Sequence, residues 1–121
     1  MARPIIEIVQ DNEVVVARLA GELDFTDADR VSTELIAATP NDAIGLVLDL
    51  SEVRYIDSSG VRMLFDLAGR LDVCRQRLAV ALPEESTIRR LIKITKLEEV
   101  VLLRASQAEC IGGLREAAGP V

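Results

Sequence analysis

The sequence predicts an α/β fold: a mixed, mostly parallel sheet of four to five strands with about four helices. Half of the 121 residues are hydrophobic and only 2% are aromatic, which is typical of a core built from branched aliphatic side chains. Near the start of the chain, two apolar runs are separated by four polar residues, and this pattern predicts a hairpin. Strand-like and helix-like patterns then alternate, which predicts βαβ units and a parallel sheet with one antiparallel strand.

The first elements follow from short-range patterns. Residues 5–9 and 14–19 are β-branched runs of strand length, and Gly21 after the second run suits a bend or a bulge. A helix is expected to start at Thr26, whose hydroxyl can cap it, and to end at residues 40–42. Its expected buried stripe consists of Ala28, Val31, Leu35 and Ala38.

The second half of the chain continues the alternation. Residues 44–50 form a nearly continuous apolar run, as expected of a central strand, and residues 51–56 are expected to connect it to a helix over residues 58–74. A strand at 78–82, a helix starting at 84–87, a strand at 100–103 and a helix from Ser106 complete the chain. The expected inward residues of these helices are Val61, Leu64, Ala68 and Leu71, then Ile88, Leu91, Ile92 and Thr95, then Ala108, Ile111 and Leu114. One domain over residues 1–121, with its core at about 5–116, accounts for all of these elements.

Composition excludes several classes of function. The net charge of −6, without basic clusters, disfavours direct binding of nucleic acid. No apolar run approaches the ~20 residues that span a bilayer, and an acid at Glu7 interrupts any signal-peptide pattern, so we expect a cytoplasmic protein without membrane contact. Histidine is absent, so neither a Ser-His-Asp nor a Cys-His arrangement can form, and no metal site or other cofactor is expected.

Residues 55–60 (Tyr-Ile-Asp-Ser-Ser-Gly) join the end of an apolar run to the start of a helix. Ser58 or Ser59 stands where a side-chain oxygen can cap the free N–H groups of that helix. The same N–H groups and the helix dipole also favour a phosphate, so one serine can be a site of modification while the other caps. Gly60 allows either tight packing between strand and helix or close approach of a kinase, and the sequence leaves both open.

Two motifs together resemble a known family. The first motif is Gly-Glu-Leu-Asp at residues 21–24, after the second strand, and the second is Ile-Asp-Ser-Ser-Gly at residues 56–60, at a strand-to-helix junction. Together with the apolar run at 46–50, they closely resemble the STAS domain. The two motifs lie about 33 residues apart in the expected elements, and the similarity covers roughly residues 5–116. Within the superfamily the chain looks like the stand-alone bacterial anti-sigma factor antagonists.

The resemblance implies a phosphorylation switch. In that family an anti-sigma factor, which is also a serine kinase of the GHKL type, phosphorylates the first hydroxyl of the motif, which is Ser58 here. The unphosphorylated antagonist binds the anti-sigma factor and frees the sigma factor, phosphorylation prevents this, and a PP2C-type phosphatase reverses it. By the same matching, Asp24, Asp57, Ser59 and Gly60 belong with Ser58 to the surface that meets the partner.

Three alternatives remain open. The chain can be a STAS subunit of a transporter or of a stress-signalling complex. An enzyme with a serine nucleophile would need Lys93, Lys96 or a carboxylate as its base, since histidine is absent. Binding of a nucleotide by the domain itself lacks support from any Gly-rich phosphate loop.

Three further features bear on these expectations. Cys74 and Cys110 are both expected to be small buried hydrophobes, although a redox-sensing disulfide is possible if their helices meet. The family often has Thr-Gly-Leu after the third helix, where this chain has Thr95-Lys96-Leu97. Without the glycine that favours a left-handed cap, this turn is expected to be built differently. Arg54 and Arg62 flank the serine motif. They can steer an acidic partner or hold a phosphate, but they are expected to be solvated surface residues.

Overall fold

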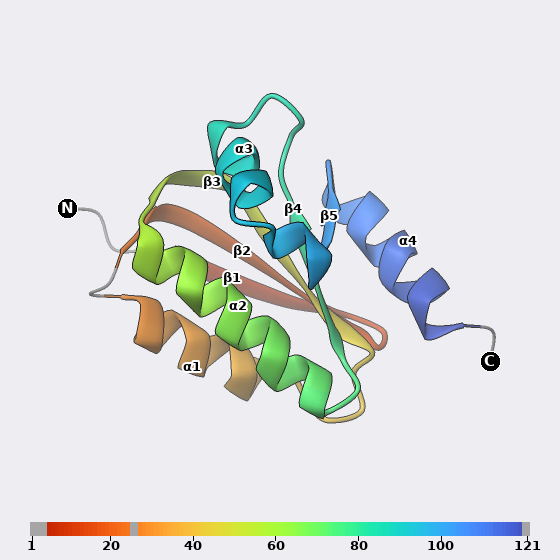
Figure 1. Ribbon diagram of the computed structural model, residues 1–121. Coiled ribbons are helices and arrows are strands. Elements are labelled where there is room, and N and C mark those ends of the chain that lie inside the picture. Colours follow the sequence, from red (N-terminus) through yellow and green to blue (C-terminus); the bar gives the residue numbers. More distant parts are fainter. Residues whose placement is uncertain (1–4, 25–26, 120–121) are drawn as a thin grey trace.

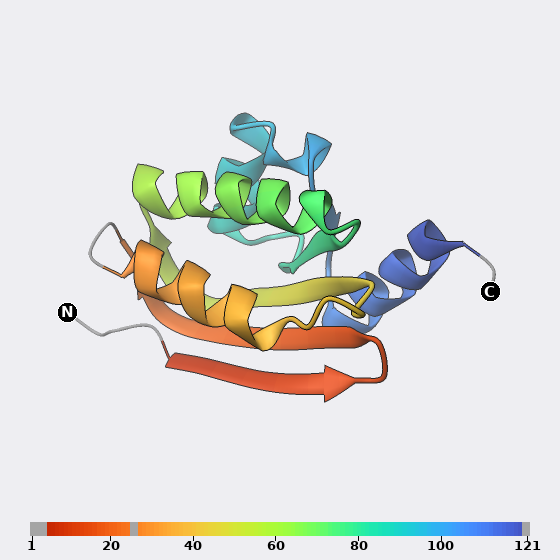
Figure 2. The ribbon, with the colours of Figure 1, turned by 90° about the horizontal axis from the view of Figure 1, so that it is seen from below.

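The computed structural model describes residues 5–24 and 27–119, and it shows a mixed sheet with helices on both faces (Figures 1 and 2). The strands are β1 (Ile5–Asp11), β2 (Val14–Leu23), β3 (Gly45–Ile56), β4 (Arg77–Ala81) and β5 (Leu102–Arg104). The helices are α1 (Ala28–Ala38), α2 (Ser58–Val73), α3 (Thr87–Ile94), the short 3-10 helix η1 (Leu97–Glu99) and α4 (Gln107–Ala118). The predicted fold class, with five strands and four α-helices among the described residues, is confirmed.

The sheet has the order β1-β2-β3-β4-β5, with only the β1–β2 pair antiparallel. Strand residues alternate between its faces. Val15, Leu46 and Val80 belong to the large core under α1, α2 and α3. Val16 and Val47 face the smaller core under α4. The apolar run at 44–50 is therefore explained by a strand that is covered on both sides.

The predicted inward stripes are largely confirmed. Val61, Leu64, Ala68 and Leu71 of α2 are all buried, as are Val31 and Leu35 of α1. Ala108 is an exception, because Cys110 and Leu114 form the inner side of α4 and leave Ala108 exposed. The expected capping role of Thr26 falls outside the described residues.

The third strand is longer than predicted. Residues 51–56 were expected to be a connection, but they continue β3 and pair with the end of β2, up to Leu23 opposite Ile56. Two register shifts in the β2–β3 ladder, one of them at Gly21, make this pairing possible. Gly21 has φ 108°, a conformation that glycine adopts without steric cost, so the predicted bulge at Gly21 is confirmed.

The two cysteines differ from expectation. Cys110 is buried as predicted, but Cys74 is exposed, because α2 ends at Val73 and the chain turns through Arg75 at φ 60°. Both thiols are free. Their helices lie on opposite faces of the sheet (Figure 2), which separates them and removes the basis for a disulfide.

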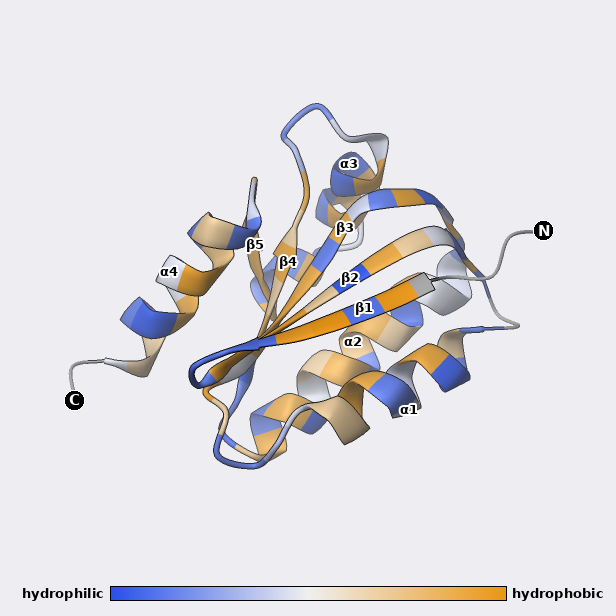
Figure 3. Ribbon diagram, turned by 180° about the vertical axis from the view of Figure 1, so that it is seen from behind, coloured by the Kyte–Doolittle hydropathy of each residue, from blue (hydrophilic) through white to orange (hydrophobic). Residues whose placement is uncertain are grey.

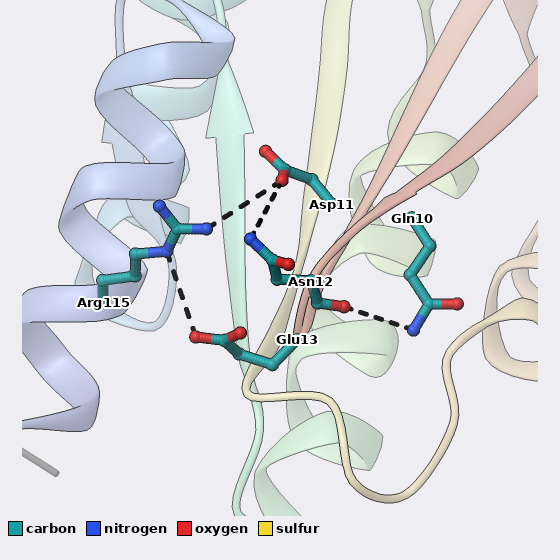
Figure 4. Close-up of polar contacts among 5 residues, drawn as sticks. All are labelled: Gln10, Asp11, Asn12, Glu13 and Arg115. Carbon is teal, nitrogen blue, oxygen red and sulfur yellow. Dashed lines mark hydrogen bonds and ion pairs between the residues drawn. The ribbon is translucent and has the colours of Figure 1, made fainter.

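Helix α4 covers only part of its face of the sheet. It packs mainly on β3, β4 and β5, so the side of β1 is left uncovered (Figure 3). Its last turn contacts the hairpin turn through Arg115, whose guanidinium lies 4.0 Å from both Asp11 Oδ1 and Glu13 Oε1 (Figure 4).

The turn after α3 keeps its left-handed conformation without glycine. Lys96 has φ 63° and ψ 22° and precedes η1. The expectation that this turn would be built differently is therefore wrong. A lysine adopts the strained conformation because Leu97 behind it is fully buried and fixes the path of the chain.

Candidate functional site

The N-terminus of α2 is capped by Asp57 and by neither serine. The Asp57 carboxylate accepts a hydrogen bond from the Gly60 N–H at 3.0 Å, and Asp57 has the extended backbone of an N-cap residue. The expectation that Ser58 or Ser59 caps this helix is wrong. A carboxylate at the cap also interacts favourably with the helix dipole, which a serine hydroxyl does less well.

Both serines are consequently released from a capping role. Ser58 is the first residue of α2 and is exposed, and within the described part of the chain its hydroxyl makes no hydrogen bond. Ser59 is half-buried and lines a groove between α1 and α2. Of the two hydroxyls, that of Ser58 is the more accessible.

Gly60 packs tightly against the end of β2. A Cβ atom on Gly60 would lie 2.8 Å from the carbonyl oxygen of Leu23 and 2.6 Å from Cγ1 of Ile56. The same Leu23 carbonyl accepts a hydrogen bond from the Asp57 N–H at 3.3 Å. The geometry thus gives Gly60 the packing role, which the sequence had left open beside kinase access.

These contacts bring the two sequence motifs together. The Gly-Glu-Leu-Asp segment ends β2 beside the last residues of β3, with Glu22 opposite Tyr55 in the ladder. Asp24 follows directly and is 7% exposed, and its carbonyl accepts the N–H groups of Asp27 and Ala28 at the start of α1. The motif at 21–24 therefore positions the starts of both α1 and α2.

The groove beside Ser59 was not anticipated from the sequence. It has a volume of about 690 Å³ and runs between α1 and α2. Arg62, Phe65 and Asp66 of α2 contribute to it, and Phe65 is 36% exposed. An aromatic residue seven positions after Ser58, off the predicted buried stripe, was the available signal. Arg54 and Arg62 are exposed, as expected.

The ionisable groups with shifted pKa values lie on the α4 side of the sheet. Burial would raise the pKa of Asp49, but hydrogen bonds from Ser51 and from Gln107, together with the charge of Arg18, outweigh it and hold the pKa below its usual value. The Gln107 amide donates to Asp49 Oδ2 at 2.7 Å and ties α4 to β3. Burial raises the pKa of the Cys110 thiol to about 11, so this thiol is protonated at neutral pH and poorly nucleophilic.

The structure offers little for the competing chemistries. Lys93 lines a hollow with Glu84, Arg89 and Arg90, whereas Ser59 lines the groove between α1 and α2. Residues 5–24 and 27–119 contain no cluster of three acidic or cysteine side chains suited to a metal ion. None of the helices in this part of the chain has the length and hydropathy needed to cross a bilayer.

Comparison with known proteins identifies the family. An anti-sigma factor antagonist from Mycobacterium paratuberculosis has a TM-score of 0.80 at 23% identity, with 93% of this chain and 94% of that chain covered. The phosphorylated form of the Bacillus cell fate determinant SpoIIAA has a TM-score of 0.63 at 22% identity, with 92% and 100% covered. A sulfate transporter family protein from Wolinella succinogenes has a TM-score of 0.74 at 15% identity, with 93% of each chain covered. At these identities the likeness shows a shared fold. The sequence model of the STAS domain matches residues 5–110, and the chain belongs to the STAS domain family.

Proposed function

We propose that the chain is an anti-sigma factor antagonist: a binding module, not an enzyme, that is switched by phosphorylation of Ser58. The observation that carries the proposal is the exposed Ser58 hydroxyl at the first position of α2, with the capping role taken by Asp57. The unphosphorylated form binds an anti-sigma factor of the GHKL serine-kinase type. A PP2C-type phosphatase restores this form after phosphorylation.

The local electrostatics support such a switch. A phosphate on Ser58 adds about −1.5 to −2 charges next to the Asp57 carboxylate. A 100-fold loss of affinity corresponds to about 2.8 kcal/mol. One like-charge contact at ~4 Å is worth up to about 4 kcal/mol at an effective dielectric of ~20 once a partner excludes water. Charge repulsion, desolvation and bulk within the interface are therefore sufficient to prevent binding.

The modified protein is expected to stay folded. The free N–H groups and the dipole at the start of α2 favour an anion, typically by 0.3–1 kcal/mol. Arg62 stands one turn after Ser58 and is exposed, so its guanidinium can approach the phosphate from the same side of the helix. Phosphorylation then changes the surface that the partner meets without disturbing the core.

The partner surface is proposed to consist of Asp57, Ser58 and Ser59, with Asp24 and Gly60, which are both buried, holding that surface in place. Asp57 and Gly60 have structural roles in it, since one caps α2 and the other allows the helix to lie against β2. Ser59 extends the surface into the groove between α1 and α2.

The test is incubation with a candidate anti-sigma factor kinase and ATP, followed by mass spectrometry and a pull-down. A phosphate should appear on Ser58, and the phosphorylated protein should no longer be retained. Ser59→Ala is the matched control, because it removes the neighbouring hydroxyl and should leave the modification intact. The proposal fails if Ser58→Ala is phosphorylated to the same extent as the wild-type protein.

A second candidate is a subunit of a transporter or stress-signalling assembly, which is favoured by the similarity to the sulfate transporter family protein. This role predicts a stable complex that neither ATP nor the substitution of Ser58 affects. A pull-down of the chain with its binding partner, before and after treatment with kinase and ATP, distinguishes the two candidates. Loss of the complex after treatment favours the antagonist, and an unchanged complex favours the subunit.

A further inference from the structure

Strand β1 forms an open edge of the sheet. It pairs with β2 on one side only, in the register that runs from Ile5–Ala20 to Asp11–Val14. A two-residue turn at Asn12 and Glu13 closes the hairpin, so Asp11 and Val14 form a hydrogen-bonded pair. Along the rest of the antiparallel ladder, hydrogen-bonded pairs alternate with pairs that are not hydrogen-bonded. The backbone N–H and C=O groups that point away from β2 are consequently those of Ile6, Ile8 and Gln10.

This edge carries apolar side chains in solvent. Val9 is 64% exposed on the side that α4 leaves uncovered (Figure 3), and Ile8 is 41% exposed on the side of α1. Natural edge strands are usually protected by charged side chains, especially lysine, by proline or by a bulge. Residues 5–11 contain no lysine or proline, both register shifts lie in the β2–β3 ladder, and the only charges on this strand are Glu7 and Asp11.

The charges of β1 suit pairing with a second copy of itself. In an antiparallel two-fold arrangement with Ile8 on the axis, Ile8 faces Ile8 of the second copy and Glu7 faces Val9 of the second copy. The outward backbone groups of the two strands then match, and no acid stands opposite an acid. The two neighbouring registers with the same backbone match would place Glu7 opposite Glu7, or Glu7 opposite Asp11, and like charges in opposite positions are destabilising.

The acids of β1 also have basic neighbours within the chain. Arg18 is the ladder partner of Glu7, and Arg115 lies 4.0 Å from Asp11 (Figure 4). These neighbours reduce the repulsion that a chain of net charge −6 would otherwise show when two copies meet.

We propose that two copies of the chain associate through β1, antiparallel and with Ile8 on the two-fold axis, so that their sheets join into one. A seven-residue strand contributes a small interface, so we expect a reversible dimer with a dissociation constant on the order of 10–100 μM. This inference does not depend on the proposed function.

Sedimentation equilibrium from about 1 μM to 1 mM tests it, because the mass should rise from 13.2 kDa toward twice that value. Ile8→Lys places two ammonium groups on the axis and should weaken association at least about tenfold. Val9→Lys faces Glu7 of the second copy and should preserve or tighten it. Ile94→Lys is the control, since Ile94 is 72% exposed on α3, remote from β1 in the chain. Circular dichroism verifies that each variant is folded.

The two lysine variants on β1 distinguish this register from unspecific association. Unspecific association would be weakened by Ile8→Lys and by Val9→Lys alike, whereas the proposed register is weakened only by Ile8→Lys. A wild-type protein that is monomeric at 1 mM overturns the proposal. So does a Val9→Lys variant that dissociates like Ile8→Lys, or an Ile94→Lys variant that abolishes the dimer.

Discussion

Replacing Gly60 by alanine tests the contact that joins the two motifs. The new Cβ would lie 2.8 Å from the Leu23 carbonyl oxygen, which is backbone and cannot rotate away as a side chain can. Overpacking of this kind costs about 1–3 kcal/mol. The better helix propensity of alanine returns at most about 1 kcal/mol. We therefore expect Gly60→Ala to lower the free energy of unfolding by about 1–2 kcal/mol.

Gly69 of the same helix supplies the matched control. A Cβ atom there has no neighbour within 4 Å, so Gly69→Ala should raise the free energy of unfolding by up to about 1 kcal/mol. Gly112 in α4 is equally open and should respond like Gly69. The same substitution is thus expected to have opposite signs at two positions of one helix.

Urea unfolding followed by circular dichroism is the suitable assay, because the chain has no tryptophan. For 121 residues, 1 kcal/mol corresponds to roughly 4 °C in melting temperature. The urea concentration at the unfolding midpoint should fall for Gly60→Ala and rise for Gly69→Ala. The dependence of the free energy of unfolding on urea concentration should stay unchanged in both variants. If Gly60→Ala is as stable as Gly69→Ala, the close contact with Leu23 does not constrain the site and the reasoning is refuted.

Three further predictions concern other parts of the molecule. Asp49→Asn should lower the free energy of unfolding by about 1–2 kcal/mol at pH 7. The difference in free energy of unfolding between Asp49→Asn and wild type should shrink as the pH falls below about 4. The reason is that the Asp49 carboxylate has a lowered pKa in the folded state and stabilises that state only when it is ionised. Urea titrations at several pH values test this, and a difference that stays constant with pH would contradict it. Lys96→Gly should raise the free energy of unfolding by up to about 1 kcal/mol, since it relieves a left-handed backbone at φ 63°, and a lower free energy of unfolding in urea titrations would argue against strain there. Iodoacetamide at pH 8 should label the exposed Cys74 in the native protein and Cys110 only after unfolding, and equal native labelling by peptide mass spectrometry would contradict the burial of Cys110.

Much of the fold could be predicted because its signals are local. Strand runs, helical stripes and the glycine bulge each depend on residues close in sequence. The extension of β3 through residues 51–56 could not, because Ser51, Glu52 and Arg54 interrupt the apolar pattern there. This segment becomes a strand only by pairing with the end of β2 across two register shifts. Cys74 was misplaced because helical periodicity points it inward, whereas the helix has already ended at Val73.

The sequence predicts the candidate site at residues 57–60, but it could not assign the helix cap within that site. Asp57, Ser58 and Ser59 all carry oxygen acceptors that suit a helix cap, so composition cannot choose among them. The choice is made by backbone conformation: the residue that remains extended after β3 becomes the cap, and this is Asp57. That depends on where β3 ends, which in turn depends on its pairing with Leu23.

The position of Ser58 is therefore fixed by rigid elements on both sides. The bulge at Gly21 carries β2 far enough to pair with the end of β3, the Leu23 carbonyl holds the Asp57 N–H, and Gly60 lets α2 begin against that carbonyl. These contacts place the backbone of Ser58, so its exposed side chain stays on this surface in any rotamer. A phosphate added to Ser58 would remain on the proposed partner surface, so the proposed switch requires no change of fold and acts through charge and bulk alone.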